Sequence, residues 1–191
     1  MTACDGPAID PSQSLVGAKQ LPSADVLSRE IIQISRGFGS PTSPLLTYEL
    51  EPDDTLTVTL THRDRTTFAE VTDGKETFHL SSKIASGARR NLWRLRPEPL
   101  EGIEQVTRPA DCPPPPTDTI AEAAVAFMPG RPKPGVAHVD LGVTEVPSAH
   151  TCATRQGVEA RNVVTSVLKS FPPSTGAAEY DRRRNEVLGP L

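Results

Sequence analysis

Residues 46–60 read LTYELEPDDTLTVTL, and this stretch decides the fold class. Apolar and polar residues alternate before and after the acidic turn at 51–54. A period of two places one set of side chains on one face of a strand and the other set on the opposite face. We therefore predict an antiparallel hairpin with one buried face. The side chains of that face are Leu46, Tyr48, Leu50, Leu56, Val58 and Leu60.

Shorter strand signals flank this hairpin. The β-branched residues of 31–34 predict a strand before it, and glycines and prolines punctuate the segment between the two. After the hairpin we predict a strand over 66–71 and another over 76–80, joined by a turn at Asp73-Gly74. In the second of these strands Phe78 is expected to face inward.

Two segments change to helical spacing. The first follows Ser81-Ser82, where a serine can cap the free amides, and it stops at Pro97. Its apolar positions are Ile84, Ala88, Leu92 and Leu95. The second ends at Pro172-Pro173 and carries one continuous apolar stripe. That stripe consists of Ala160, Val163, Val164, Val167, Leu168 and Phe171.

The segment 119–128 fits two structures. Its alanines and the Thr119/Glu122 pair favour a helix with a capping box, whereas Val125 and Phe127 favour a strand. We favour the strand, paired with 136–143.

Strands followed by a helix, and then a shorter version of the same order, predict an α+β fold. We expect an antiparallel sheet with two helices packed on one face, which allows two β-β-α-like halves at about 25–108 and 109–172. The predicted single domain thus spans 25–172. Flexible tails are expected at 1–24 and 173–191, because these ends show no sustained apolar period.

Composition narrows the function classes. Among the 191 residues 36% are hydrophobic and 4% aromatic, and the formal net charge is −4. Nucleic-acid binders rely on a basic surplus, so such a role is not expected. No apolar run approaches the roughly 20 residues of a membrane-spanning helix.

The three cysteines are Cys4, Cys112 and Cys152, and none forms a CxxC pair. A zinc ribbon or thioredoxin-type site is therefore not expected. Cys112 and Cys152 each precede an element of the second half, so they form a disulfide if both elements pack on one sheet. The alternative is two unrelated buried thiols.

Thr2-Ala3-Cys4 resembles the end of a bacterial lipoprotein signal, in which a small residue precedes the cysteine that becomes lipidated. The resemblance covers only these residues. It implies lipidation of Cys4, a polar tether after it, and a location in the periplasm or cell envelope. Because Met1 stands three positions before Cys4, this reading requires the rest of the signal upstream. Without an upstream signal the expected location is the cytoplasm.

Cys152 and His150 lie two residues apart, which on a strand places them on the same face. With Asp140 or Asp111 they make a candidate thiol–imidazole pair for a small hydrolase-like enzyme. With Cys112 they make three candidate zinc ligands, but a fourth is not evident. We therefore assign no catalytic, cofactor-binding or metal-binding residue.

One basic segment, 83–96, contains an aromatic residue. Its candidate partner-binding residues are Arg89, Arg90, Trp93, Arg94 and Arg96, beside Lys83. Such a helix suits an acidic partner, a phosphate group or an anionic membrane surface. The alternative is a solvated helix face whose arginine stems cover the edge of the core.

These observations predict a non-catalytic binding or structural protein, which a lipid on Cys4 would hold at the cell envelope if the signal resemblance applies. The first alternative is the cysteine–histidine enzyme. The second is a cytoplasmic protein that binds an acidic partner through the helix at 83–96. The partner remains an unknown protein or acidic ligand, and the membrane is reached only through the lipid anchor.

Overall fold

The structure is a computed structural model that describes residues 27, 29–37, 43–97, 105–107, 112, 123–130, 142–146 and 152–188. The expected N-terminal tail at 1–24 lies outside these residues. In chain order the elements are β1 (Ile31–Gly37), β2 (Leu45–Leu50), β3 (Thr55–Arg63), β4 (Glu70–His79), α2 (Ser82–Trp93), β5 (Gln105–Thr107), β6 (Ala123–Met128), β7 (Gly142–Val146), α3 (Arg155–Ser170) and α4 (Thr175–Leu188).

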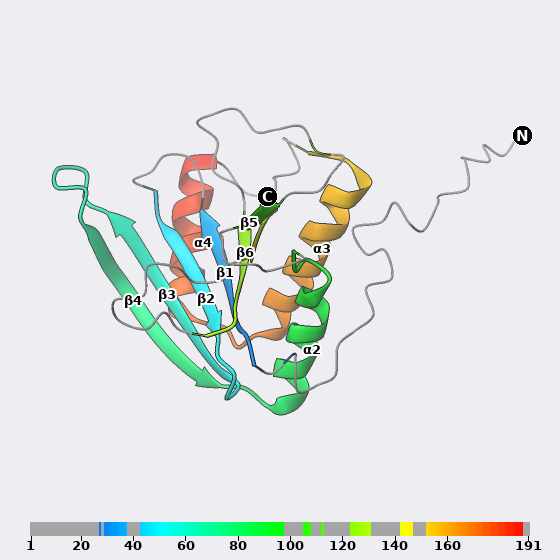
Figure 1. Cartoon of the computed structure of the whole chain (residues 1–191). Coiled ribbons are helices and arrows are strands. Elements are labelled where there is room, and N and C mark those ends of the chain that lie inside the picture. The colour runs from blue at the N-terminus through cyan, green and yellow to red at the C-terminus, as the bar shows by residue number, and fades with distance from the viewer. Residues whose placement is uncertain are drawn as a thin grey trace, which may run out of the picture.

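The predicted α+β fold is confirmed. The described strands form one sheet in the order β4-β3-β2-β1-β6-β7-β5, and all neighbours are antiparallel except β5 and β7. Strands β1–β4 join the second half where β1 pairs with β6, whereas β5, from the end of the first half, pairs with β7 at the far edge of the sheet. Figure 1 shows α2 and α3 side by side against the sheet, with α4 beside β2 and β3. None of the helices described has the length and apolar character needed to cross a bilayer.

The hairpin at 46–60 forms in the predicted register. Leu46 pairs with Leu60, Tyr48 with Val58 and Leu50 with Leu56. All six side chains are buried in the same core cluster as the helices, while the threonines of β3 lie on the opposite face. The period-two pattern therefore identified both the strands and their buried side.

The predicted strands at 66–71 and 76–80 are wrong in detail. Residues 70–79 form one strand, β4, and residues 66–69 belong instead to an earlier turn at Asp64–Ala69. There the Asp64 carboxylate accepts the amides of Thr66 and Thr67. Asp73-Gly74 is a bulge rather than a turn, because Gly74 lies opposite Leu60 while Thr72 lies opposite Thr61. Glycine and aspartate suit a bulge as well as a turn, and the sequence alone does not separate the two. The side chain of Phe78 faces inward as predicted, and it is half-buried against the core.

Both predicted helices are confirmed. Ser81 caps α2 by accepting the amide of Ile84, and the helix stops before Pro97. Thr154 caps α3, and α3 ends at Ser170, directly before Phe171 and the two prolines. The residues of the α3 stripe are buried except Leu168, which is half-buried.

The strand reading of 119–128 is confirmed for Ala123–Met128, and residues 119–122 lie outside the described part. The strand predicted to pair with it, 136–143, is placed too early in the chain. The partner β7 runs from Gly142 to Val146, so that Ala123 pairs with Val146 and Phe127 with Gly142. The segment before it, 131–141, is not described, and the proline and glycine signals there did not fix where the strand begins.

The expected flexible tail at 173–191 is wrong, because residues 175–188 form α4. Its Tyr180 is 1% exposed. At the start of α4 the Glu76 carboxylate accepts the Thr175 hydroxyl at 2.6 Å and the Gly176 amide at 3.1 Å, and these bonds lower the pKa of Glu76. A carboxylate that accepts orphan amides stabilises a helix N-terminus. Because this carboxylate comes from β4, the local sequence of the tail gave no sign of it.

Candidate functional site

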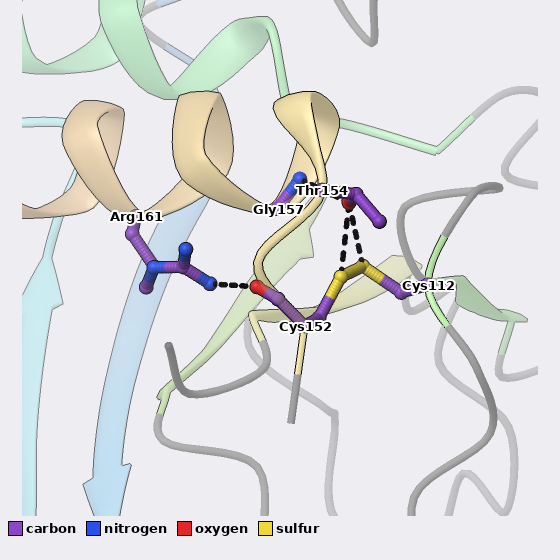
Figure 2. Close-up of a disulfide and its surroundings, with 5 residues drawn as sticks. All are labelled: Cys112, Cys152, Thr154, Gly157 and Arg161. Carbon is purple, nitrogen blue, oxygen red and sulfur yellow. Dashed lines mark hydrogen bonds between the residues drawn. A yellow bond between two sulfur atoms is a disulfide. The ribbon is translucent and has the colours of Figure 1, made fainter. Parts of the chain in front are cut away.

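Cys112 and Cys152 form the predicted disulfide, with their Cα atoms 5.4 Å apart. Cys152 lies just before α3, and Cys112 comes from the segment before β6 (Figure 2). Both cysteine residues are buried, at 9% exposure for Cys112 and 2% for Cys152. The bridge therefore fixes the start of α3 to a segment 40 residues earlier in the chain.

The first turn of α3 is built directly on this disulfide, as Figure 2 shows. The Thr154 hydroxyl lies 3.0 Å from Cys152 Sγ and 3.5 Å from Cys112 Sγ, and its oxygen accepts the Gly157 amide at 3.2 Å. A Cβ on Gly157 would lie 2.8 Å from Cys152 Sγ. Only glycine lets the helix approach the disulfide this closely.

We expect Gly157→Ala to destabilise the protein by about 1–3 kcal/mol, because the added methyl group overpacks the disulfide. The matched control is Gly87→Ala in α2, where an added Cβ meets no described atom within 4 Å. There alanine should stabilise by about 0.5–1 kcal/mol through helix propensity. Urea denaturation measures both effects, and stabilisation by both substitutions would contradict the close contact.

The candidate thiol–imidazole pair is not brought together in the described residues. His150, Asp111 and Asp140 lie outside them, and the sulfur of Cys152 is in the disulfide. A disulfide sulfur is neither a thiolate nucleophile nor a zinc thiolate. Among the described residues no cluster of three or more His, Cys, Asp or Glu side chains forms a metal site.

The predicted basic surface at 83–96 is corrected by the position of Arg89. Arg89 is 2% exposed and donates to the backbone carbonyls of Leu27, Glu30 and Glu51, the Glu30 bond being 2.6 Å. Burial lowers its pKa, and nearby carboxylates oppose that shift. Arg89 follows Ala85 and Ala88 on the buried stripe of α2, so it joins the helix to the segment before β1.

Trp93 and Arg96 are also structural. Trp93 is 7% exposed, and the Arg96 guanidinium lies 4.7 Å from the centre of its ring. Arg96 makes three hydrogen bonds to the Glu30 carboxylate: its Nε donates to both oxygens, and its Nη2 donates to Oε1 at 2.6 Å. Only Arg90 and Arg94 of the five candidates remain exposed. The expected partner-binding surface is thus reduced to these two arginines, with Lys83 beside them.

A cavity of about 800 Å³ lies between α3 and α4, over the sheet. Its floor is a row of residues from three adjacent strands, because Arg36 pairs with Ala123 and Ala123 pairs with Val146. One wall is α3 and the other is α4, and the connection at 171–174 closes one end. The hollow exists because α3 packs beside α2, while α4 packs on β2, β3 and β4.

The apolar part of the cavity centres on Tyr48 and Phe171, whose ring centres are 6.0 Å apart. Burial raises the pKa of Tyr48, and the positive charge of Arg36 opposes that shift. The phenol is therefore neutral at physiological pH. The remaining apolar lining comes from Ala123, Val146, Val164, Leu168, Pro172, Pro173 and Ala177.

The polar part of the cavity is basic. In the part of the lining that the structure describes, the cations are Arg36, Arg161, Lys169 and Arg184, and the one carboxylate is that of Asp181. Arg36 is 3.5 Å from Asp181 and lies over the Tyr180 ring.

Two of these cations have a distinct role in the local structure. Arg161 Nη1 donates to the Cys152 carbonyl at 2.6 Å, which links the cavity wall to the disulfide segment (Figure 2). Arg184 Nη1 is buried and has no hydrogen-bond partner within the described part of the chain. Arg89 Nε and Trp93 Nε1 are also buried without a hydrogen-bond partner there, and of these three residues Arg184 is the one that lines the cavity.

Sequence reasoning missed this cavity. Arg184 belongs to the run Arg182-Arg183-Arg184, which was assigned to a tail. The available signal was the glycine and tyrosine of α4, Gly176 and Tyr180, which lie four residues apart on one helix face.

No protein-family model matches the chain, and no curated protein resembles it in sequence. Function therefore has to be inferred from the chemistry of the site.

Proposed function

We propose that this protein is a non-catalytic binding protein that holds a small molecule in the cavity between α3 and α4. The observation that carries the proposal is the cavity itself. Its volume of about 800 Å³ falls in the range of roughly 300–1,000 Å³ that small-molecule sites occupy. Such sites combine a mainly apolar lining with a few polar groups, as the lining around Tyr48 and Phe171 does.

We further infer that the protein works in an oxidising compartment. Disulfides persist in the periplasm and outside the cell and are rare in the cytosol. The Cys112–Cys152 bridge supports this location, and it leaves Cys4 as the odd cysteine. A lipid on Cys4 would then hold the protein at the cell envelope.

The two alternatives have less support. An enzyme that uses Cys152 as its nucleophile would need that sulfur as a free thiol, and the disulfide occupies it. Binding of an acidic protein through 83–96 would have to rely on Arg90, Arg94 and Lys83, because Arg89 and Trp93 are buried.

The cavity is tested by filling it. Ala177 lines the cavity, whereas Ala178 is exposed next to it on α4. We expect the apolar dye N-phenyl-1-naphthylamine to bind the oxidised full chain with a rise in fluorescence. Ala177→Trp should weaken this binding by at least about tenfold, because the indole occupies the space of the ligand.

The matched control is Ala178→Trp, which adds the same side chain outside the cavity and should leave dye binding unchanged. Circular dichroism checks that both variants are folded. Absence of dye binding to the wild type, or equal binding by the two variants, would overturn the cavity as the binding site.

A further inference from the structure

We propose that the ligand of the cavity is an amphipathic anion, meaning a small molecule with one carboxylate, phosphate or sulfonate group attached to an apolar body. This inference rests on the proposed function and specifies its ligand. The anionic group would lie against Arg184 and Lys169, and the apolar body against Tyr48 and Phe171.

The charge of the cavity is opposite to that of the chain. Among the described residues, four cationic side chains and one carboxylate line it, a surplus of three positive charges, whereas the whole chain has a formal net charge of −4. A concentration of one sign of charge in a hollow with apolar walls raises the local concentration of ligands of opposite sign. Cationic ligands are disfavoured by the same field.

Two of the four cations are available to a ligand. Arg36 faces Asp181, and Arg161 donates to the Cys152 carbonyl. Lys169 and Arg184 make no side-chain hydrogen bond or ion pair within the residues that the structure describes.

Arg184 is the stronger of the two indications, because it is half-buried in the cavity lining and its Nη1 atom has no acceptor in the described part of the chain. The fork of a guanidinium suits a carboxylate or phosphate, and an anionic oxygen that enters the cavity would bind it with a charge-assisted hydrogen bond. Lys169 is exposed at the rim, where it adds attraction rather than fixed geometry.

The apolar walls separate an amphipathic ligand from a simple ion. An inorganic anion would leave the surface around Tyr48, Phe171 and Leu168 in contact with water. Covering that surface contributes roughly 25 cal/mol for each Å² of apolar area. An apolar body attached to the anion therefore increases affinity over the ion alone.

The test compares ligands that share one alkyl chain and differ in charge. Decanoate, decanol and decyltrimethylammonium are titrated into the oxidised full chain, with inorganic phosphate as a fourth arm. The amide resonances of Leu168 and Ala177, followed by NMR, report on the two walls of the cavity. We expect saturable binding of decanoate at least about tenfold tighter than that of decanol, and weaker binding still by the cation and by phosphate.

Variants then identify the group that binds the charge. Arg184→Gln should weaken decanoate binding by at least about tenfold and leave decanol binding unchanged. The matched control is Arg94→Gln, which removes an exposed cation that does not line the cavity and should leave both affinities unchanged. Equal losses for decanoate and decanol in Arg184→Gln would mean that Arg184 shapes the cavity instead of binding the charge.

The outcomes distinguish this inference from the proposed function. Decanol or the cation binding as tightly as decanoate would overturn the anion and leave a binding cavity. Phosphate binding as tightly as decanoate would overturn the apolar half of the ligand. Failure of every alkyl ligand and of the naphthylamine dye would overturn both proposals.

Discussion

Arg89→Met should lower the free energy of unfolding by about 3 kcal/mol or more. Methionine replaces the stem of the arginine but not its donors, so the carbonyls of Leu27 and Glu30 lose hydrogen bonds to a buried charge. A buried acceptor left without its partner costs about 1–3 kcal/mol, and Arg89 also serves the carbonyl of Glu51. The effect is measured by urea denaturation followed by circular dichroism.

The control is the neighbouring residue. Arg90 is exposed on the same helix, so Arg90→Met should change stability by no more than about 0.5 kcal/mol. A second readout is hydrogen exchange in β1, which should accelerate in Arg89→Met because the segment before β1 loses its attachment to α2. Equal stabilities of the two variants would show that Arg89 is not a structural link.

The second large effect concerns the disulfide. Replacing both Cys112 and Cys152 by alanine should lower the free energy of unfolding by about 3–4 kcal/mol, since the bridge closes a loop across 40 residues. The melting temperature should fall by about 10 °C, at roughly 2–4 °C per kcal/mol for a chain of this size. The denaturant m-value should rise, because the unfolded chain without the bridge exposes more surface.

Reduced wild-type protein is the matched comparison, because it keeps both sulfurs and lacks only the bond. It should show a loss of similar size to that of the double variant. Alkylation under denaturing conditions without reductant should modify one cysteine, Cys4, when Cys4 carries no lipid, and all three after reduction. Three modified cysteines without reductant, or a stability loss below about 1 kcal/mol, would contradict a stabilising bridge.

The regular elements of this protein could be predicted where one face is apolar at a fixed period. The hairpin at 46–60 and helices α2 and α3 follow such patterns, and their ends carry serine or threonine caps and prolines. The pairing of Cys112 with Cys152 was one of two alternatives compatible with the sequence, and the structure contains the disulfide. These features depend on local sequence and on simple layer packing.

The parts that could not be predicted depend on contacts between distant residues. The helix α4 needs Glu76 from β4 at its first turn and Leu46 and Leu60 near Gly176. Arg89 appeared to belong to a solvated face, because its three carbonyl partners are not visible in the residues beside it.

The cavity depends on distant contacts in the same way. Its lining comes from β1, β2, β6, β7, α3 and α4 and from the connection between the last two. No short window of sequence contains it.

The position of β1 has a consequence for how the chain reaches its native state. β1 pairs on one side with β2, which follows it closely, and on the other side with β6, which begins only at Ala123. Local pairings close small loops and form first, so the meander β1–β4 is expected to assemble while one side of β1 is still open. At that stage β1 is an unpaired edge strand, and such an edge is a template for aggregation. In the finished sheet β1 is central, and the edge strands are β4 and β5. The segment between Cys112 and Cys152 contains β6 and β7. Formation of the Cys112–Cys152 disulfide early in folding would therefore shorten the time during which β1 lacks its second neighbour, β6.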